Sequence, residues 1–169
     1  EYYPAQYEEM KKFIESGRWH ISGASWDATD TLVPSIESAL RNIMLGQDYY
    51  RKEFGVESTD IFLPDCFGFG WTLPAIASHC GLIGFSSQKL QWRNKPFYGN
   101  DKYPFTVGLW QGIDGSTIMM THGYDYNQRF EDGDLSENKD LLELTGHSPL
   151  HMVYRYYGTG DIGGSPTLE

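Results

Sequence analysis

Three aspartates stand close behind segments that we predict to be strands of a parallel sheet. They are Asp30 after residues 19–25, Asp65 after residues 60–63 and Asp161 after residues 151–157. In parallel α/β proteins, the loops at the carboxyl ends of the strands carry the ligand sites. Each aspartate also has glycine or an aromatic residue nearby, so all three are candidates for chemistry at one rim.

Two carboxylates at one rim suit glycosyl transfer to water. One acid can protonate the leaving oxygen while the other attacks the sugar carbon. Aromatic rings beside them would offer flat apolar faces to the C–H bonds of a sugar, although each ring could equally be an ordinary packing residue. The candidate rings are Trp26, Trp71, Trp92 and Trp110.

A structural role is the alternative for each aspartate, because Asp before a helix often caps it. For Asp65 we favour function, since the next helix is predicted to begin several residues later, beyond an aromatic and glycine-rich loop. For Asp30 we favour the structural role. For Asp161 both readings stay open, because Gly-Asp-x-Gly is also common in turns.

The first half of the chain alternates predicted helices and strands. Apolar spacing predicts helices at 4–16, 34–55 and 72–80, and strands at 19–25, 60–63 and 82–89. The helix at 34–55 has Ser35 as its N-cap and Gly55 as its stop. Its apolar stripe is predicted to be Ile36, Leu40, Ile43 and Met44. This alternation is typical of parallel strands covered by helices.

The pattern changes in the second half. Two strands are predicted around Asp114-Gly115, which is a strong hairpin signal. Residues 131–146 are acidic and predict an exposed loop with a short helix, and 151–157 predicts a last strand. The fold class is therefore α/β, with parallel strands alternating with helices and a β-hairpin insertion.

Composition excludes some functions. The chain has 169 residues and a net charge of -10, which disfavours binding to nucleic acid. No apolar run approaches the roughly 18 residues of a membrane-spanning helix, so we expect no membrane partner. A homo-oligomer remains open.

Several separated blocks resemble glycoside hydrolase family 38, the α-mannosidases. In order they read GRWHISGASWDATDT, GQDYYRKEFG, LPDCFGFGWTLPAI, SSQKLQW, WQGIDGS and YGTGDIGG. They span nearly the whole chain. The resemblance implies a retaining α-mannosidase that carries one divalent metal, zinc or calcium, and acts on an α-mannoside or an N-glycan-type oligosaccharide. It also implies a fold that is part of a (β/α)7-type barrel.

The resemblance assigns roles to individual residues. It implies that Asp65, in the PDxFG block, is both the nucleophile and a metal ligand, and that Asp161 is the acid/base. It places substrate contacts at Tyr124 and Asp125, to which we add the aromatic candidates Trp26 and Trp71.

The chain departs from the family pattern at the metal ligands. The family has a His-x-Asp pair near the start of the domain and a histidine ligand after the acid/base loop, and no His-x-Asp occurs here. We therefore expect residues 1–169 to be the middle of one catalytic domain, with strands missing at both ends, and to be inactive alone. A non-catalytic carbohydrate-binding domain is the alternative, and a metal-dependent deacetylase ranks below both.

Overall fold

The computed structural model describes most of the chain. The described residues are 3–91, 106–122 and 135–156. The helices are α1 (Pro4–Glu15), α2 (Ile36–Phe54), α3 (Leu73–His79) and α4 (Lys139–His147), with short 3-10 turns η1 (Lys89–Gln91) and η2 (Leu135–Glu137). The strands are β1 (Asp60–Phe62), β2 (Gly84–Ser87), β3 (Val107–Gln111) and β4 (Thr117–His122).

The strands form one mostly parallel sheet in the order β1-β2-β4-β3. The neighbours β1, β2 and β4 run parallel, and β3 is antiparallel to β4. The predicted hairpin is confirmed, and its turn needs Gly115, which has a φ of 86°. The α/β class with a hairpin is thus confirmed at the level of a small mixed sheet and its helices.

Helix α2 forms where its capping residues predict. The Ser35 hydroxyl accepts a hydrogen bond from the Ser38 backbone N–H at 3.2 Å. At the other end Gly55 takes a left-handed conformation with a φ of 67°, which ends the helix without steric strain. Both predicted ends of this helix are confirmed.

The predicted apolar stripe of α2 is wrong in part. Ile43 is buried, but Ile36 and Met44 are 55% and 63% exposed. The buried face instead includes Gly46, because residues 24–26 lie directly against the backbone of the helix there. A stripe predicted from apolar side chains could not include Gly46, because this residue packs closely only since it has no side chain.

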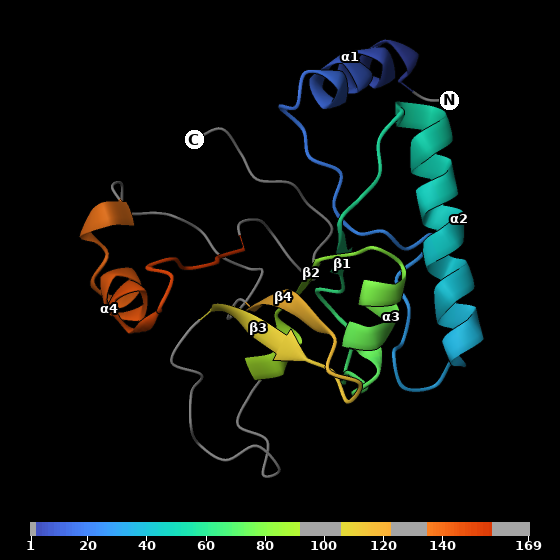
Figure 1. Ribbon diagram of the computed structural model, residues 1–169. Coiled ribbons are helices and arrows are strands. Elements are labelled where there is room, and N and C mark those ends of the chain that lie inside the picture. Colours follow the sequence, from blue (N-terminus) through green and yellow to red (C-terminus); the bar gives the residue numbers. More distant parts are fainter. Residues whose placement is uncertain (1–2, 92–105, 123–134, 157–169) are drawn as a thin grey trace.

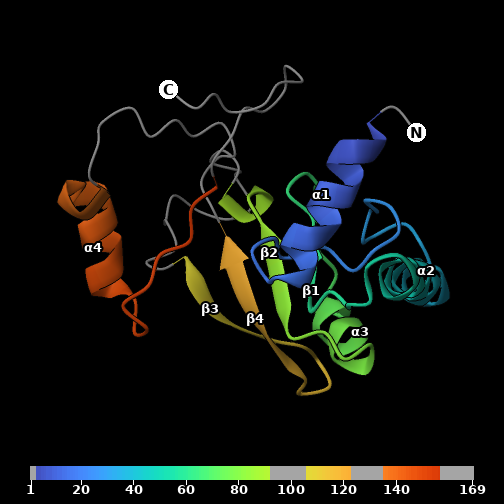
Figure 2. The ribbon, with the colours of Figure 1, turned by 90° about the horizontal axis from the view of Figure 1, so that it is seen from above.

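The core lies between the sheet and two helices on its β1 side (Figures 1 and 2). Helices α2 and α3 lie near β1, whereas α4 lies beyond β3 at the other end of the sheet. The buried cluster consists of Ala24, Ile43, Ile61, Leu63, Leu73, Ile76, Ala77, Leu82, Phe85 and Ile118. This packing fixes β1 and β2, the two strands that position the candidate site.

The predicted strand at 19–25 is wrong. Residues 20–24 run as irregular chain beside β1, where the Ala24 N–H donates to the Asp60 carbonyl at 2.8 Å. The segment does not continue as a strand because Gly23 has a φ of 84°, which is outside the extended region.

The predicted strand at 151–157 is also wrong for its described part, 151–156, which is irregular. His151 has a φ of 51° and its N–H donates to the Ser148 carbonyl at 2.9 Å, so the chain turns there. Further on, the Tyr154 N–H donates to the Thr106 hydroxyl at 2.6 Å rather than to the carbonyl of a neighbouring strand.

In the described part of the chain, no helix is long and apolar enough to cross a membrane.

Candidate active site

Asp65 lies just beyond the carboxyl end of β1, as predicted. Strand β2 runs parallel to β1, with Phe62 paired to Ser86. Asp65 and Lys89 each lie three residues beyond that pair, one on each strand. Because parallel strands advance in the same direction, equal offsets bring both side chains to the same edge of the sheet.

The Asp65 carboxylate forms an ion pair with this lysine. The Lys89 Nζ lies 2.7 Å from the Asp65 Oδ1, and the side chains are 7% and 58% exposed respectively. An exposed carboxylate is thus held by an ammonium whose stem is almost completely buried. Such a pair differs from a surface ion pair, because the lysine has little freedom to move away.

The loop after Asp65 supports the same lysine. The Lys89 Nζ lies 4.6 Å from the centre of the Phe67 ring, a cation–π distance. Further along the loop, the Thr31 hydroxyl donates to the Gly68 carbonyl at 2.7 Å. The Phe67 ring and the Thr31 hydroxyl therefore tie the Asp65 loop both to the lysine and to the chain before α2.

Gly68 is required by the shape of this loop. Its φ is 132°, a conformation that residues with a side chain rarely adopt, and a Cβ there would lie 2.6 Å from the Leu32 Cδ1. The glycine in the PDCFGF stretch is thus explained by backbone geometry and by its close neighbour.

The capping alternative for Asp65 is not what the structure shows. Helix α3 begins at Leu73, and its N-cap is Thr72, which makes no side-chain capping bond. The Asp65 carboxylate instead pairs with the Lys89 ammonium. Asp65 therefore lies at the sheet edge and does not cap α3. Its role in chemistry stays a prediction.

Asp30 has the structural role that the sequence favoured. Its Oδ1 accepts from the N–H groups of Leu32 and Val33 at 2.6 and 3.0 Å. It therefore closes the turn before α2, while Ser35 caps the helix itself.

The tryptophan candidates are placed differently from one another. Trp71 is 76% exposed in the loop between Asp65 and α3. Trp26 is 60% exposed and packs edge-on against Tyr49 of α2, with the ring centres 5.5 Å apart. Trp110 packs against Phe85 of the core at 5.3 Å. Trp110 thus has a packing role, and Trp71 is the tryptophan nearest to Asp65 along the chain.

The remaining predicted site residues lie outside the described part of the chain. They are Trp92, Tyr124, Asp125 and Asp161. Their roles stay predictions.

Sequence reasoning missed the polar residues buried at the carboxyl ends of β2 and β4. Ser87 and His122 are register partners there, and both are completely buried. The Ser87 hydroxyl accepts from the Lys89 N–H at 3.1 Å, so it helps to set the start of η1. Sequence reasoning also missed Lys89 as the partner of Asp65. The signal that could have found it is its position after β2, which matches that of Asp65 after β1.

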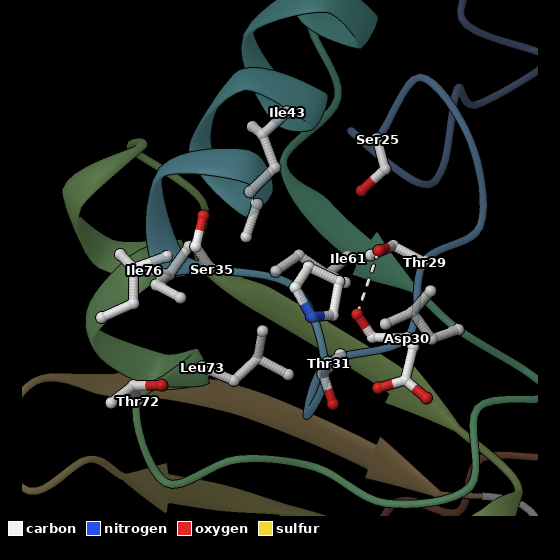
Figure 3. Close-up of a pocket in the computed structure, with 14 residues that line it drawn as sticks. Ser25, Thr29, Asp30, Thr31, Ser35, Ile43, Ile61, Thr72, Leu73 and Ile76 are labelled. Carbon is white, nitrogen blue, oxygen red and sulfur yellow. Dashed lines mark hydrogen bonds between the residues drawn. The ribbon is translucent and has the colours of Figure 1, made fainter.

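A small cavity lies elsewhere, between α2, α3 and β1 (Figure 3). Its volume is about 50 Å³. Apolar side chains of Ile43, Ile61 and Leu73 line it, with Asp30 at the rim, and Asp65 is not among its lining residues. Pockets for small ligands usually measure roughly 300 Å³ or more, so this cavity suits a few waters rather than a sugar ring.

The described residues do not fit a divalent metal on their own. Among them, no three His, Cys, Asp or Glu side chains come together as a metal-binding group. Zinc in proteins usually has three or four protein ligands, and Asp65 alone is too few. One oxygen of Asp65 is also held by the Lys89 ammonium.

Comparison with known proteins matches the chain to one family. Residues 1–168 match the model of the glycosyl hydrolases family 38 N-terminal domain. The chain is 37% identical over 175 residues to alpha-mannosidase G of Dictyostelium discoideum, and 30% identical over 168 residues to alpha-mannosidase 2C1 of Homo sapiens. These alignments use 99% and 98% of this chain, but the chain spans only 15% of either relative.

Two solved structures resemble the fold. An alpha-mannosidase from Enterococcus faecalis V583 gives a TM-score of 0.52 at 21% identity, covering 70% of this chain and 13% of that one. The 4-alpha-glucanotransferase from Thermococcus litoralis gives a TM-score of 0.63 at 16% identity, covering 93% of this chain and 24% of that one. At these identities the likeness concerns the fold alone.

Proposed function

Because this chain belongs to glycoside hydrolase family 38, we propose that it is part of a retaining α-mannosidase. Its substrate would be an α-mannoside or an N-glycan-type oligosaccharide. Two relatives that match almost all of this chain are named alpha-mannosidases, which supports this substrate class.

The observation that carries the proposal is the state of Asp65. Its carboxylate is exposed beyond the carboxyl end of a parallel strand and is held there by a nearly buried lysine. A nucleophile must reach the substrate yet keep one orientation, and this arrangement meets both needs. The exposed ring of Trp71, in the loop that follows Asp65, suits a sugar face.

The proposed reaction has two steps. In the first, an Asp65 oxygen bonds to the anomeric carbon, the glycosidic C–O bond breaks, and the leaving oxygen takes a proton from the proposed acid, Asp161. In the second, a water oxygen bonds to the same carbon, the bond to Asp65 breaks, and the water gives a proton to Asp161. Retention requires the two carboxyl groups to lie about 5 to 5.5 Å apart.

The complete fold is proposed to be a (β/α)7-type barrel, of which these strands are part. The parallel order of β1, β2 and β4 and the likeness to the two solved structures support this proposal. The metal that the resemblance implies, zinc or calcium, would need ligands in addition to Asp65, and the steps above use none of its chemistry. We also propose that residues 1–169 alone do not turn over a mannoside.

The proposal predicts that Asp65→Ala abolishes turnover in the full-length protein. The assay is release of an aryl leaving group from an aryl α-mannoside. The matched control is Asp48→Ala, because Asp48 pairs with Lys52 on the exposed side of α2 and should be dispensable. Trapping with a slowly hydrolysed fluorinated mannosyl substrate, followed by peptide mass spectrometry, should place the sugar on Asp65.

Full activity of Asp65→Ala, or a trapped sugar on another residue, would remove Asp65 from this role. An inverted anomeric configuration of the released mannose, measured by NMR, would overturn the retaining mechanism. Loss of activity in Asp48→Ala to the same extent would show that the assay reports folding rather than chemistry.

A further inference from the structure

We propose that Lys89 is a positioning residue that holds one oxygen of Asp65 throughout the reaction cycle and stabilises this carboxylate as it leaves the sugar. This inference rests on the proposed function of Asp65. It concerns a lysine to which the resemblance gives no role.

The geometry of the parallel strands makes the contact a property of the fold. Asp65 and Lys89 follow register partners at equal offsets, so pairing of β1 with β2 is enough to bring them together. The distance of 2.7 Å between the Lys89 Nζ and the Asp65 Oδ1 is that of a charge-assisted hydrogen bond.

Lys89 is held in place before any substrate arrives. Its side chain is only 7% exposed, its Nζ lies over the Phe67 ring, and its N–H is bonded to the buried Ser87 hydroxyl. A flexible surface lysine would lose much of its side-chain freedom on forming the same contact. Lys89 can therefore act as a preorganised donor.

The contact divides the two oxygens of Asp65 between two tasks. Oδ1 accepts from Lys89, which leaves Oδ2 as the atom that bonds to the anomeric carbon. In the glycosyl-enzyme, Oδ1 becomes the ester carbonyl oxygen and still accepts from the ammonium. When water displaces the sugar, the C–Oδ2 bond breaks and its electron pair returns to the carboxylate, whose negative charge Lys89 then stabilises.

The two chemical steps depend on Lys89 in opposite ways. In the first step the carboxylate loses charge, so the ammonium makes Asp65 a weaker nucleophile while keeping its orientation. In the second step the carboxylate regains charge, so the ammonium makes Asp65 a better leaving group. Removing the charge should therefore slow the second step more than the first.

The test uses Lys89→Met in the full-length protein, because methionine retains much of the apolar stem beside Phe67. We expect kcat on an activated aryl mannoside to fall roughly ten- to hundredfold, which corresponds to the loss of one charge-assisted hydrogen bond. KM should fall with kcat, and mass spectrometry of quenched reactions should show accumulated mannosyl-enzyme. Lys89→Arg should restore part of kcat by keeping the charge.

A matched control is Lys52→Met, since Lys52 forms a lysine–aspartate pair of similar length, 2.6 Å, on the surface of α2. It should leave kcat and KM unchanged. If Lys89→Met does not fold, Lys89→Gln takes its place, because it also lacks the charge.

Three results would overturn the inference. They are unchanged kinetics in the Lys89 variants, equal losses in kcat and kcat/KM without accumulated adduct, and no recovery in Lys89→Arg. A wild-type protein that forms no adduct on Asp65 would instead refute the proposed function, and the inference about Lys89 would fall with it.

Discussion

Replacing Gly46 with alanine tests the packing that supports β1. Gly46 lies inside α2, where alanine would ordinarily stabilise the helix. Here a Cβ would lie 2.1 Å from the Ala24 carbonyl oxygen and 2.7 Å from the Trp26 nitrogen. Both neighbours are backbone atoms, so no side-chain rotation can relieve the clash.

The magnitude follows from what must move. The 24–26 segment would have to retreat by more than about 1 Å to restore an ordinary van der Waals contact. It is anchored by the Ala24 N–H to the Asp60 carbonyl at 2.8 Å and by the Trp26 N–H to the Asn42 carbonyl at 2.9 Å. Two weakened bonds at about 1 kcal/mol each and overpacking of about 1–3 kcal/mol outweigh a helix gain of about 1 kcal/mol. We expect a net destabilisation of about 2–4 kcal/mol.

The assay is native-state hydrogen exchange of the full-length protein, read by mass spectrometry on peptides that cover residues 20–27 and 60–63. Local exchange suits a large protein, whose global unfolding need not be two-state. The matched control is Gly146→Ala, which makes the same substitution inside α4, where a Cβ meets nothing within 4 Å. It should stabilise α4 by about 0.5 kcal/mol.

We therefore expect Gly46→Ala to lower local stability and Gly146→Ala to raise it. Unchanged exchange at residues 20–27 in Gly46→Ala would refute the close approach of this segment to α2. Because Asp60 begins β1, which leads to Asp65, activity should fall together with protection in Gly46→Ala.

Two further predictions concern the site loop and the first helix. Gly68→Ala should destabilise the Asp65 loop by about 1–3 kcal/mol, because of its φ of 132° and the contact with Leu32, and should lower kcat; unchanged activity and loop exchange would contradict this. The hydrogen bond from the Lys11 ammonium lowers the pKa of Glu53, so this contact between α1 and α2 is present at neutral pH and is lost as pH falls through that lowered pKa. Hydrogen exchange of α1 should rise over that acid range, and in Glu53→Gln it should be raised already at pH 7. Glu57→Gln is the control, because it removes a pair outside α1, and it should leave the exchange of α1 unchanged.

The sequence predicted best where local chemistry decides the structure. The cap at Ser35, the left-handed stop at Gly55 and the turn at Asp114-Gly115 each depend on a few adjacent residues, and all three are as predicted. The helix at 36–54, the strand at 60–62 and the place of Asp65 after that strand were also predicted correctly, because the apolar runs that predict them are local patterns in the sequence.

The failures share one cause. The segment at 19–25 has the composition of a strand, but Gly23 takes a positive φ. Its Ala24 N–H donates to the Asp60 carbonyl of β1, whereas the Ser22 hydroxyl and the Gly23 N–H donate to the Asp60 side chain instead of to a strand backbone. Residues 151–156 likewise read as a strand, yet they turn at His151 and bond to a side chain. Strand formation needs a partner edge, which no local pattern specifies.

The sequence by itself determined the types of most elements, the caps of α2 and the family, and it singled out Asp65. Only the tertiary structure decided which strands are neighbours and in which register, and therefore that Lys89 meets Asp65 while Asp30 serves a turn. The physical reason is range: helices, caps and turns are set by contacts a few residues apart, whereas register is set by burial of side chains and pairing of backbone groups between distant segments.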